Sequence, residues 1–199
     1  MSEPDGSPTA SWRASRMVGQ LVGSGTTLGG KGRRAVAIKD GLLVEFDHEM
    51  GTTRKLLERL PEDRLSWKPH PKSMSLGGLA THLAHIPAWG SIILNEPFFD
   101  LAASPTNIAE KTSRGEILAG FDECRTSTRA ALDKTDAELM VPWALKRGIH
   151  QMFSMPRAAA FRTFVLYHIV HHRGQLSVYM RLNDVAVPAI YGPSADEGT

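Results

Sequence analysis

Four segments of this 199-residue chain repeat their apolar side chains at the spacing of an α-helix, and this pattern limits the fold more than any other feature. The segments cover residues 38–60, 76–94, 114–135 and 157–184. Breaks that contain proline or glycine separate them, and strand signals are too sparse for an α/β sheet. Four helices with connectors of mixed length predict an all-α fold, a four-helix bundle.

One side of each predicted helix carries the residues that we expect in the core. They are Leu42, Phe46, Met50, Leu57 and Leu60, then Leu76, Leu79, Leu83, Ile86 and Ile93, then Ile117, Phe121, Cys124, Thr128 and Ala131, and finally Phe161, Phe164, Val165, His168, His172, Leu176 and Tyr179. Ser73 or Ser75 is a plausible N-cap of the second helix. Pro156 suits the first turn of the last helix. Cys124 is interpreted as a small buried apolar residue.

The remaining segments are less regular. Residues 1–37 are rich in Ser, Gly and Thr and poor in large apolar side chains, so we expect a disordered N-terminal extension. Residues 38–199 form the predicted bundle domain. The stretch from Trp143 to Phe153 is compatible with either a short hairpin or an irregular loop.

Charge and composition exclude several classes of protein. The formal net charge is +2, and no basic stripe indicates a nucleic-acid partner. The single cysteine, Cys124, allows no intramolecular disulfide, and no apolar run approaches the roughly 20 residues that span a bilayer. We therefore expect a cytoplasmic protein with neither a membrane nor a nucleic-acid partner.

The stretch HIVHHRGQL, residues 168–176, holds three histidines in five positions. His168 and His172 are four residues apart, so on a helix they are offset by about 40° and about 6 Å and project from one face. Two imidazoles at this spacing are a common way for one helix to bind a transition metal. His171 is rotated by about 100° from His172 and points elsewhere. The HExxH motif of zinc proteases is absent.

A third metal ligand has to come from another helix. His82 continues the row of Leu79 and Ile86 on the second helix, whereas His85 lies nearer the edge of that helix. We therefore prefer His82. Three histidines without a fourth protein ligand would leave one coordination position open, as in catalytic sites. The alternative is that the histidines only pack in the core with hydrogen-bond partners.

Two longer motifs resemble the DinB family, the damage-inducible DinB/YfiT type of bundle protein. They are MSLGGLATHLAHIPAW at residues 74–89 and FVLYHIVHHRGQLSVYMRLNDVAVPAIYGPSADE at residues 164–197, and the likeness covers roughly residues 38–197. The resemblance implies a bundle of up-down-down-up topology, often a dimer. It also implies a divalent metal site with three histidine ligands, which at the matching positions are His82, His168 and His172. Imidazole ligands suit Zn, Ni, Fe or Cu.

Some members of the wider family are thiol S-transferases, so the resemblance implies the same chemistry here. A metal with an open position would hold a low-molecular-weight thiol as the thiolate that attacks an electrophile. Arg173 and Gln175 are candidate cofactor-binding residues. Gln175 could hydrogen-bond to the second ring nitrogen of His172 or to the substrate, and Arg173 could pair with a carboxylate or with the acidic groups of the thiol. Gly174 is expected to permit close helix approach. A metal-dependent hydrolase and a non-catalytic metal- or ligand-binding protein are the alternatives.

Overall fold

The structure is a computed structural model that describes residues 36–104 and 108–198. The disorder expected for residues 1–37 falls, except for the last two of them, outside this described part of the chain. Within it, no helix is long and apolar enough to cross a membrane.

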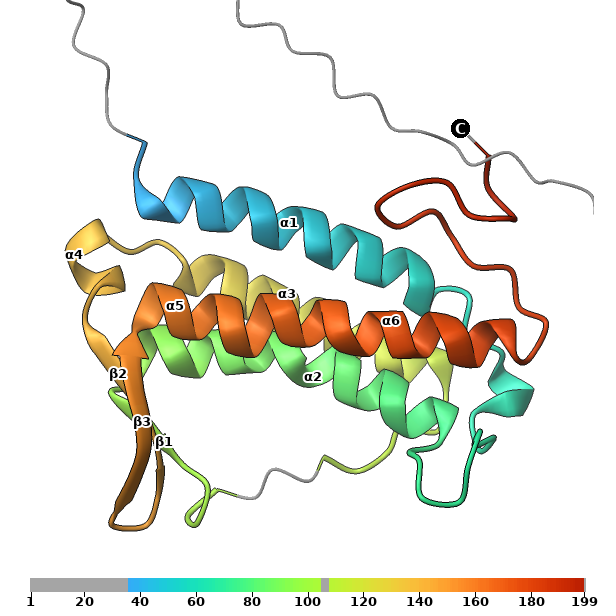
Figure 1. Cartoon of the computed structure of the whole chain (residues 1–199), viewed down its shortest axis with the longest axis horizontal. Helices are drawn as coiled ribbons and strands as arrows, with labels where there is room; N and C mark the ends of the chain where they lie inside the picture. The colour runs from blue at the N-terminus through green and yellow to red at the C-terminus, as the bar shows by residue number, and fades with distance from the viewer. Residues whose placement is uncertain (1–35, 105–107, 199) are drawn as a thin grey trace, which may run out of the picture. The chain divides into compact units, whose positions relative to one another are not determined.

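Four long helical rods form the bundle that the apolar spacing predicted. The rods are α1 (Ile38–Leu57), α2 (Leu76–Asn95), α3 (Arg114–Ala131) and a last rod made of α5 (Arg157–Phe161), a π-helical segment (Arg162–Leu166) and α6 (Tyr167–Arg181). A 3-10 turn (Glu62–Arg64) and the short α4 (Asp136–Leu139) lie between them. In Figure 1, α1 and the last rod run in one direction while α2 and α3 run in the other. The expected up-down-down-up topology is confirmed.

A small sheet departs from the purely helical expectation. Strand β1 (Phe98–Asp100) pairs in parallel with β2 (Pro142–Arg147), and β2 pairs antiparallel with β3 (His150–Pro156), with an irregularity between Leu145 and Lys146. The β2–β3 hairpin resolves the ambiguity left at Trp143–Phe153. Strand β1 lies between the second and third predicted helices, where no strand was expected, because it forms only against a strand more than forty residues away.

The core follows the predicted rows in α1 and α2, whose named apolar residues are all buried. Ser75, not Ser73, caps α2: its hydroxyl accepts a hydrogen bond from the Gly78 amide at 2.9 Å. The face of α3 is less complete, since Cys124 is half-buried rather than fully buried. Burial still raises the pKa of its thiol. The last rod begins at Arg157, as the apolar pattern predicted, whereas Pro156 ends β3 and takes the N-cap position of α5, not a position in its first turn.

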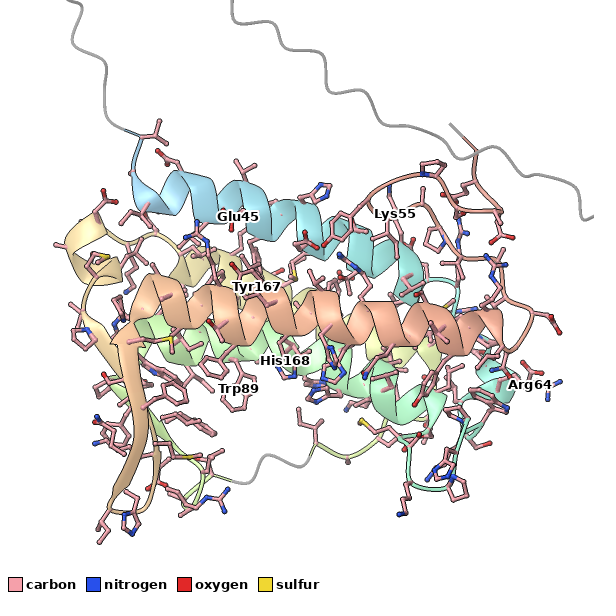
Figure 2. All side chains as sticks on the ribbon, viewed as in Figure 1. Glu45, Lys55, Arg64, Trp89, Tyr167 and His168 are labelled. Carbon is pink, nitrogen blue, oxygen red and sulfur yellow. The ribbon has the colours of Figure 1, made fainter. Side chains whose placement is uncertain are left out.

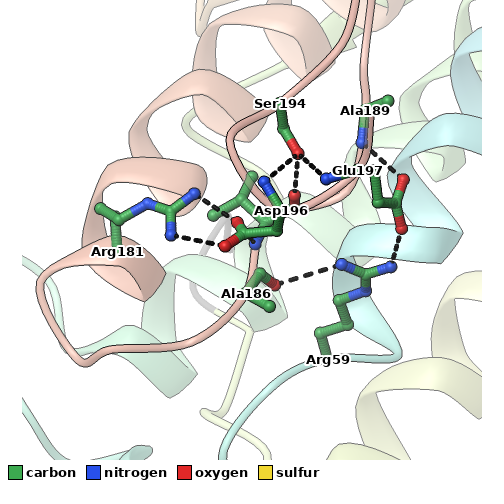
Figure 3. A network of polar contacts seen from close by, with 8 residues as sticks. Arg59, Arg181, Ala186, Ala189, Ser194, Asp196 and Glu197 are labelled. Carbon is green, nitrogen blue, oxygen red and sulfur yellow. Dashed lines mark hydrogen bonds and ion pairs between the residues drawn. The ribbon is translucent and has the colours of Figure 1, made fainter. Parts of the chain in front are cut away.

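The C-terminal segment beyond α6 folds back and is held by its own acidic residues (Figure 3). Asp196 accepts hydrogen bonds from Arg181 and, at 2.8 Å, from the Val187 amide. Glu197 pairs with Arg59 of the turn after α1 and accepts from the Ala189 amide. These contacts tie the end of the chain to the ends of α1 and α6.

Candidate metal centre

Three imidazoles from two helices converge on one point. The Nε2 atom of His168 lies 3.3 Å from Nε2 of His82 and 2.9 Å from Nε2 of His172. One ring nitrogen of each histidine lies within 4.8 Å of the other two, and all three residues are half-buried. Helix α2 packs against α6, which places His82 opposite the other two; Figure 2 labels His168 at this helix pair. We call His82, His168 and His172 the triad.

The second ring nitrogens of two triad histidines are already used as donors. Nδ1 of His172 donates to the side-chain oxygen of Gln175 at 2.7 Å. The ring of His168 hydrogen-bonds to the backbone of Phe164, an interaction that raises its pKa and therefore has the ring as donor. A neutral imidazole carries one N–H, so both Nε2 atoms present lone pairs to each other across 2.9 Å. Two facing lone pairs repel unless a cation lies between them.

A proton bound to one of the rings does not readily supply this positive charge, because the pKa of each ring is lowered. Burial, followed by the nearby charges of His172, His168 and His85, lowers the pKa of His82 to about 4. Burial also lowers the pKa of His168 and of His172, the largest opposing influence on His172 being its hydrogen bond with Gln175. The three rings are therefore neutral near pH 7, the form in which histidine binds a metal.

The spacing of the triad fits a transition metal. Two nitrogens bound to one Zn²⁺ at about 2.0–2.1 Å with a tetrahedral angle lie about 3.3 Å apart. The His82–His168 separation of 3.3 Å matches that value, and the His168–His172 separation of 2.9 Å is slightly shorter. Among the described residues, no Asp, Glu or Cys joins the triad as a further ligand. The residues thus fit an ion held by three neutral ligands.

The other histidines near the triad do not belong to it. His85 turns its Nδ1 back to the Thr81 carbonyl at 2.9 Å, and its ring lies beside Gly120 of α3. His171 is exposed and contacts His172 only ring to ring, with centroids 4.8 Å apart. The preference for His82 over His85, and the exclusion of His171, agree with this arrangement.

Arg173 is turned away from the triad, toward α1. Its side chain is 1% exposed and forms an ion pair with Glu49 at 2.6 Å, so the expected carboxylate partner is present. It also donates to the Thr53 hydroxyl and to the Tyr191 hydroxyl of the C-terminal segment. Binding a thiol through Arg173 would require this cluster to open, and that role stays a prediction. Sequence reasoning missed Tyr191 because its partners are distant in the chain.

Gly174 does not serve the purpose expected of it. A β-carbon built at this position meets no atom within 4 Å, so close helix approach does not require glycine there. The close approach lies instead at Gly90 of α2, where a β-carbon would come within 2.4 Å of the Thr128 side chain of α3. Gly90 is therefore the glycine that lets two helices pack closely.

A family model named DinB family matches residues 37–199, which span the whole bundle and the triad. The chain belongs to the DinB family. A curated relative is the uncharacterized protein YrdA of Bacillus subtilis strain 168, which is 28% identical over 158 residues. The match covers 79% of this chain and 90% of YrdA.

Two solved structures extend the comparison of this DinB-family chain. A DinB-like protein from Bacillus cereus is 26% identical with a TM-score of 0.60, and the match covers 76% of this chain and 97% of that one. YfiT from Bacillus subtilis, described as a probable metal-dependent hydrolase with an unusual four-helix bundle topology, is 15% identical with a TM-score of 0.56. That match covers 79% of this chain and 95% of YfiT, and it shows a shared fold.

Proposed function

We propose that this protein is a metal-dependent enzyme that transfers a low-molecular-weight thiol to an electrophilic carbon, in detoxification or a stress response. The observation that carries the proposal is the convergence of the Nε2 atoms of His168 and His172, 2.9 Å apart, on His82. Such a site selects a divalent cation over a proton. A thiol and an electrophile are then its small-molecule partners.

The neutral surroundings of the triad favour an anionic cosubstrate. Its three ligands carry no charge, and the groups that orient them are an amide oxygen of Gln175 and a backbone group of Phe164. A divalent ion bound there would keep its full charge and, as a Lewis acid, would lower the pKa of a thiol ligand. The protein's part is to hold the three rings in their neutral form and in one orientation.

Thiol transfer needs no carboxylate beside the triad. No carboxylate joins the triad among the described residues. A thiol has an ordinary pKa near 8.5, so it ionises at neutral pH with far less help than water needs. In the reaction the sulfur forms a bond to carbon, the leaving group departs with the electron pair of its own bond, and the thiol proton passes to solvent.

A fluorogenic thiol assay tests this proposal. The metal-loaded protein is mixed with monochlorobimane and each of glutathione, bacillithiol and mycothiol, and thioether formation is compared with His82→Ala and His171→Ala. We expect the parent protein and His171→Ala to accelerate the reaction of one thiol above its uncatalysed rate. His82→Ala should give no acceleration. Equal rates in all three proteins for every thiol, across several electrophiles, would contradict thiol transfer.

Metal-dependent hydrolysis is the second candidate, because the structurally similar YfiT is described as a probable metal-dependent hydrolase. A hydrolase would act without added thiol. Incubation of the metal-loaded protein with a panel of ester, amide and phosphoester chromogenic substrates in thiol-free buffer separates the two. Turnover that depends on His82 and is unchanged by thiol would favour the hydrolase. A protein that binds metal and turns over neither class would be a binding module.

A further inference from the structure

The small sheet places two aromatic pairs on one of its faces, since Phe99 and Phe153 both lie opposite Leu145 of β2. Phe99 of β1 lies 4.8 Å from Trp89 of α2, and Phe153 of β3 stacks on Phe164 of the π-helical segment at 5.2 Å with an interplanar angle of 5°. The buried Trp143 of β2 joins Phe153 and Phe164 at 6.4 Å and 6.0 Å. We call Trp89, Phe99, Phe153 and Phe164 the aromatic wall.

Two helix spacings connect the aromatic wall to the triad. Phe164 precedes His168 by four residues, and its backbone hydrogen-bonds to the His168 ring. Trp89 follows His82 by seven residues, which on a helix is a rotation of only about 20°. Figure 2 labels both residues, and Trp89 lies closer than His168 to the end of the bundle that meets the sheet. Trp89 and Phe164 therefore lie on the same sides of their rods as His82 and His168, and they carry Phe99 and Phe153 of the sheet as ring partners.

All four rings of the wall keep partial exposure. Each is half-buried, whereas Phe46, Phe121 and Phe161 of the bundle core are 0% exposed. The four rings pack against the core and keep part of their surface exposed. The indole of Trp143, which contacts Phe153 and Phe164, is by contrast fully buried.

We propose that Trp89, Phe99, Phe153 and Phe164 bind an aromatic group of the electrophile that reacts at the triad. This inference rests on the proposed function for the identity of the substrate. Half-exposed ring faces and edges favour a planar aromatic group, since aromatic pairs gain about 0.5–1.5 kcal/mol beyond the area that they bury, or about two- to tenfold in affinity. The wall would then place the reactive carbon next to the three imidazoles.

The first test measures binding without any reaction. Benzyl alcohol and cyclohexylmethanol, which are inert and similar in size, are titrated against the metal-loaded protein by calorimetry without thiol. We expect benzyl alcohol to bind about two- to tenfold more tightly. That preference should vanish in Trp89→Leu and in Phe99→Leu. The second substitution lies on the short outer strand β1. It should persist in Trp67→Leu, a matched control whose half-buried indole packs on Tyr179 instead.

Several outcomes would overturn the aromatic wall. Equal affinity of the two alcohols, lack of binding by either up to its solubility limit, or an aromatic preference that survives in both Trp89→Leu and Phe99→Leu would each do so. These results are independent of turnover, so they stand apart from a failure of thiol transfer.

The second test applies once a thiol is found to react. Rates with styrene oxide and cyclohexyloxirane, each divided by its uncatalysed rate, give a selectivity ratio for the parent and each variant. Loss of wall residues should lower this ratio by raising KM for styrene oxide more than for cyclohexyloxirane. A merely structural role of the rings would change both substrates in parallel, and that result would count against the proposal.

Discussion

The Nε2 atoms of His82 and His168 lie 3.3 Å apart although 86 residues separate them in the chain. The contact exists because α2 packs against α6, with His172 completing the group one helical turn further along. A single half-buried histidine would not indicate a metal site. The convergence of three on one point does, and the following measurements test it.

Removing any triad histidine should remove the metal. We expect the parent protein to purify with about one equivalent of a divalent transition metal, and His82→Ala, His168→Ala and His172→Ala to bind it at least about tenfold more weakly, because ligand loss costs no less than loss of a group that orients a ligand. Elemental analysis by mass spectrometry measures this. His171→Ala is the control, and metal loss in it but not in His168→Ala would contradict the ligand set.

Gln175 should strengthen metal binding by orienting the ring of His172. Its side-chain oxygen accepts from Nδ1 of His172 at 2.7 Å and so keeps the lone pair on Nε2. Gln175→Leu should weaken metal affinity by about 10–100-fold, the usual cost of removing such a partner. Competition with a chromogenic chelator measures the affinity. Gln151→Leu, at an exposed position of β3, should bind as the parent does; equal affinities in all three proteins would remove Gln175 from the site.

Acid should destabilise the metal-free protein. The pKa of His82 is lowered to about 4 by burial and by its neighbouring histidines, below its ordinary value of 6.5. Between these values the unfolded chain binds more protons than the folded one, so the free energy of unfolding falls as pH decreases from about 6.5 to about 4. Urea titrations in chelator at several pH values should show this slope. His82→Phe should flatten it, and an unchanged slope would assign the effect to other groups.

The Glu49–Arg173 pair should matter far more than an exposed ion pair. Arg173 is 1% exposed and Glu49 14%, so Glu49→Ala leaves a buried guanidinium without its charge partner. Such a loss costs about 3–5 kcal/mol of unfolding free energy. Asp47→Ala breaks the exposed pair with Arg129 and should cost at most about 1 kcal/mol. Urea denaturation at pH 7 compares them, and similar losses would show that the buried cluster has no special weight.

Two glycine substitutions should have opposite signs. A β-carbon at Gly90 would lie 2.4 Å from Thr128 and 2.9 Å from Phe161, so Gly90→Ala should destabilise by about 1–3 kcal/mol. Gly174 is helical with open space around it, so Gly174→Ala should stabilise by about 0.5–1 kcal/mol. Thermal unfolding gives both signs. Stabilisation by Gly90→Ala would mean that α2 and α3 can separate without cost.

The parts of the fold that the sequence predicts well are those with local causes. The rows Leu42–Phe46–Met50 and Leu79–Leu83–Ile86 are buried as expected, because a regular helix repeats its faces without reference to the rest of the chain. Strand β1 was missed because its only cause is pairing with β2. The same holds for the partners of Arg173, since Glu49 and Tyr191 meet it only in the folded chain.

The last rod shows a different limit of pattern reasoning. Its expected single face, from Phe161 to Tyr179, divides into two. Phe161, Val165 and Leu176 are buried in the core, while Phe164, His168, His172 and Tyr179 are half-buried on the neighbouring side. The π-helical segment at Arg162–Leu166 also interrupts the 3.6-residue repeat inside the rod. His168 and His172 both follow that segment, so it does not alter their spacing.

The π-helical segment divides the last rod into two α-helical parts whose faces are rotated relative to each other. A π turn accommodates one more residue than an α turn, so it shifts everything after it by about 100° relative to a continuous α-helix. The half that meets the sheet and the half that bears two imidazoles can therefore face their own neighbours independently. Deleting one residue from Arg162–Leu166 should rotate His168 and His172 away from His82, and the buried Leu176 with them. A relative without this extra residue would carry the same face one position earlier in the rod, so an alignment without a gap in this segment would pair the wrong side chains.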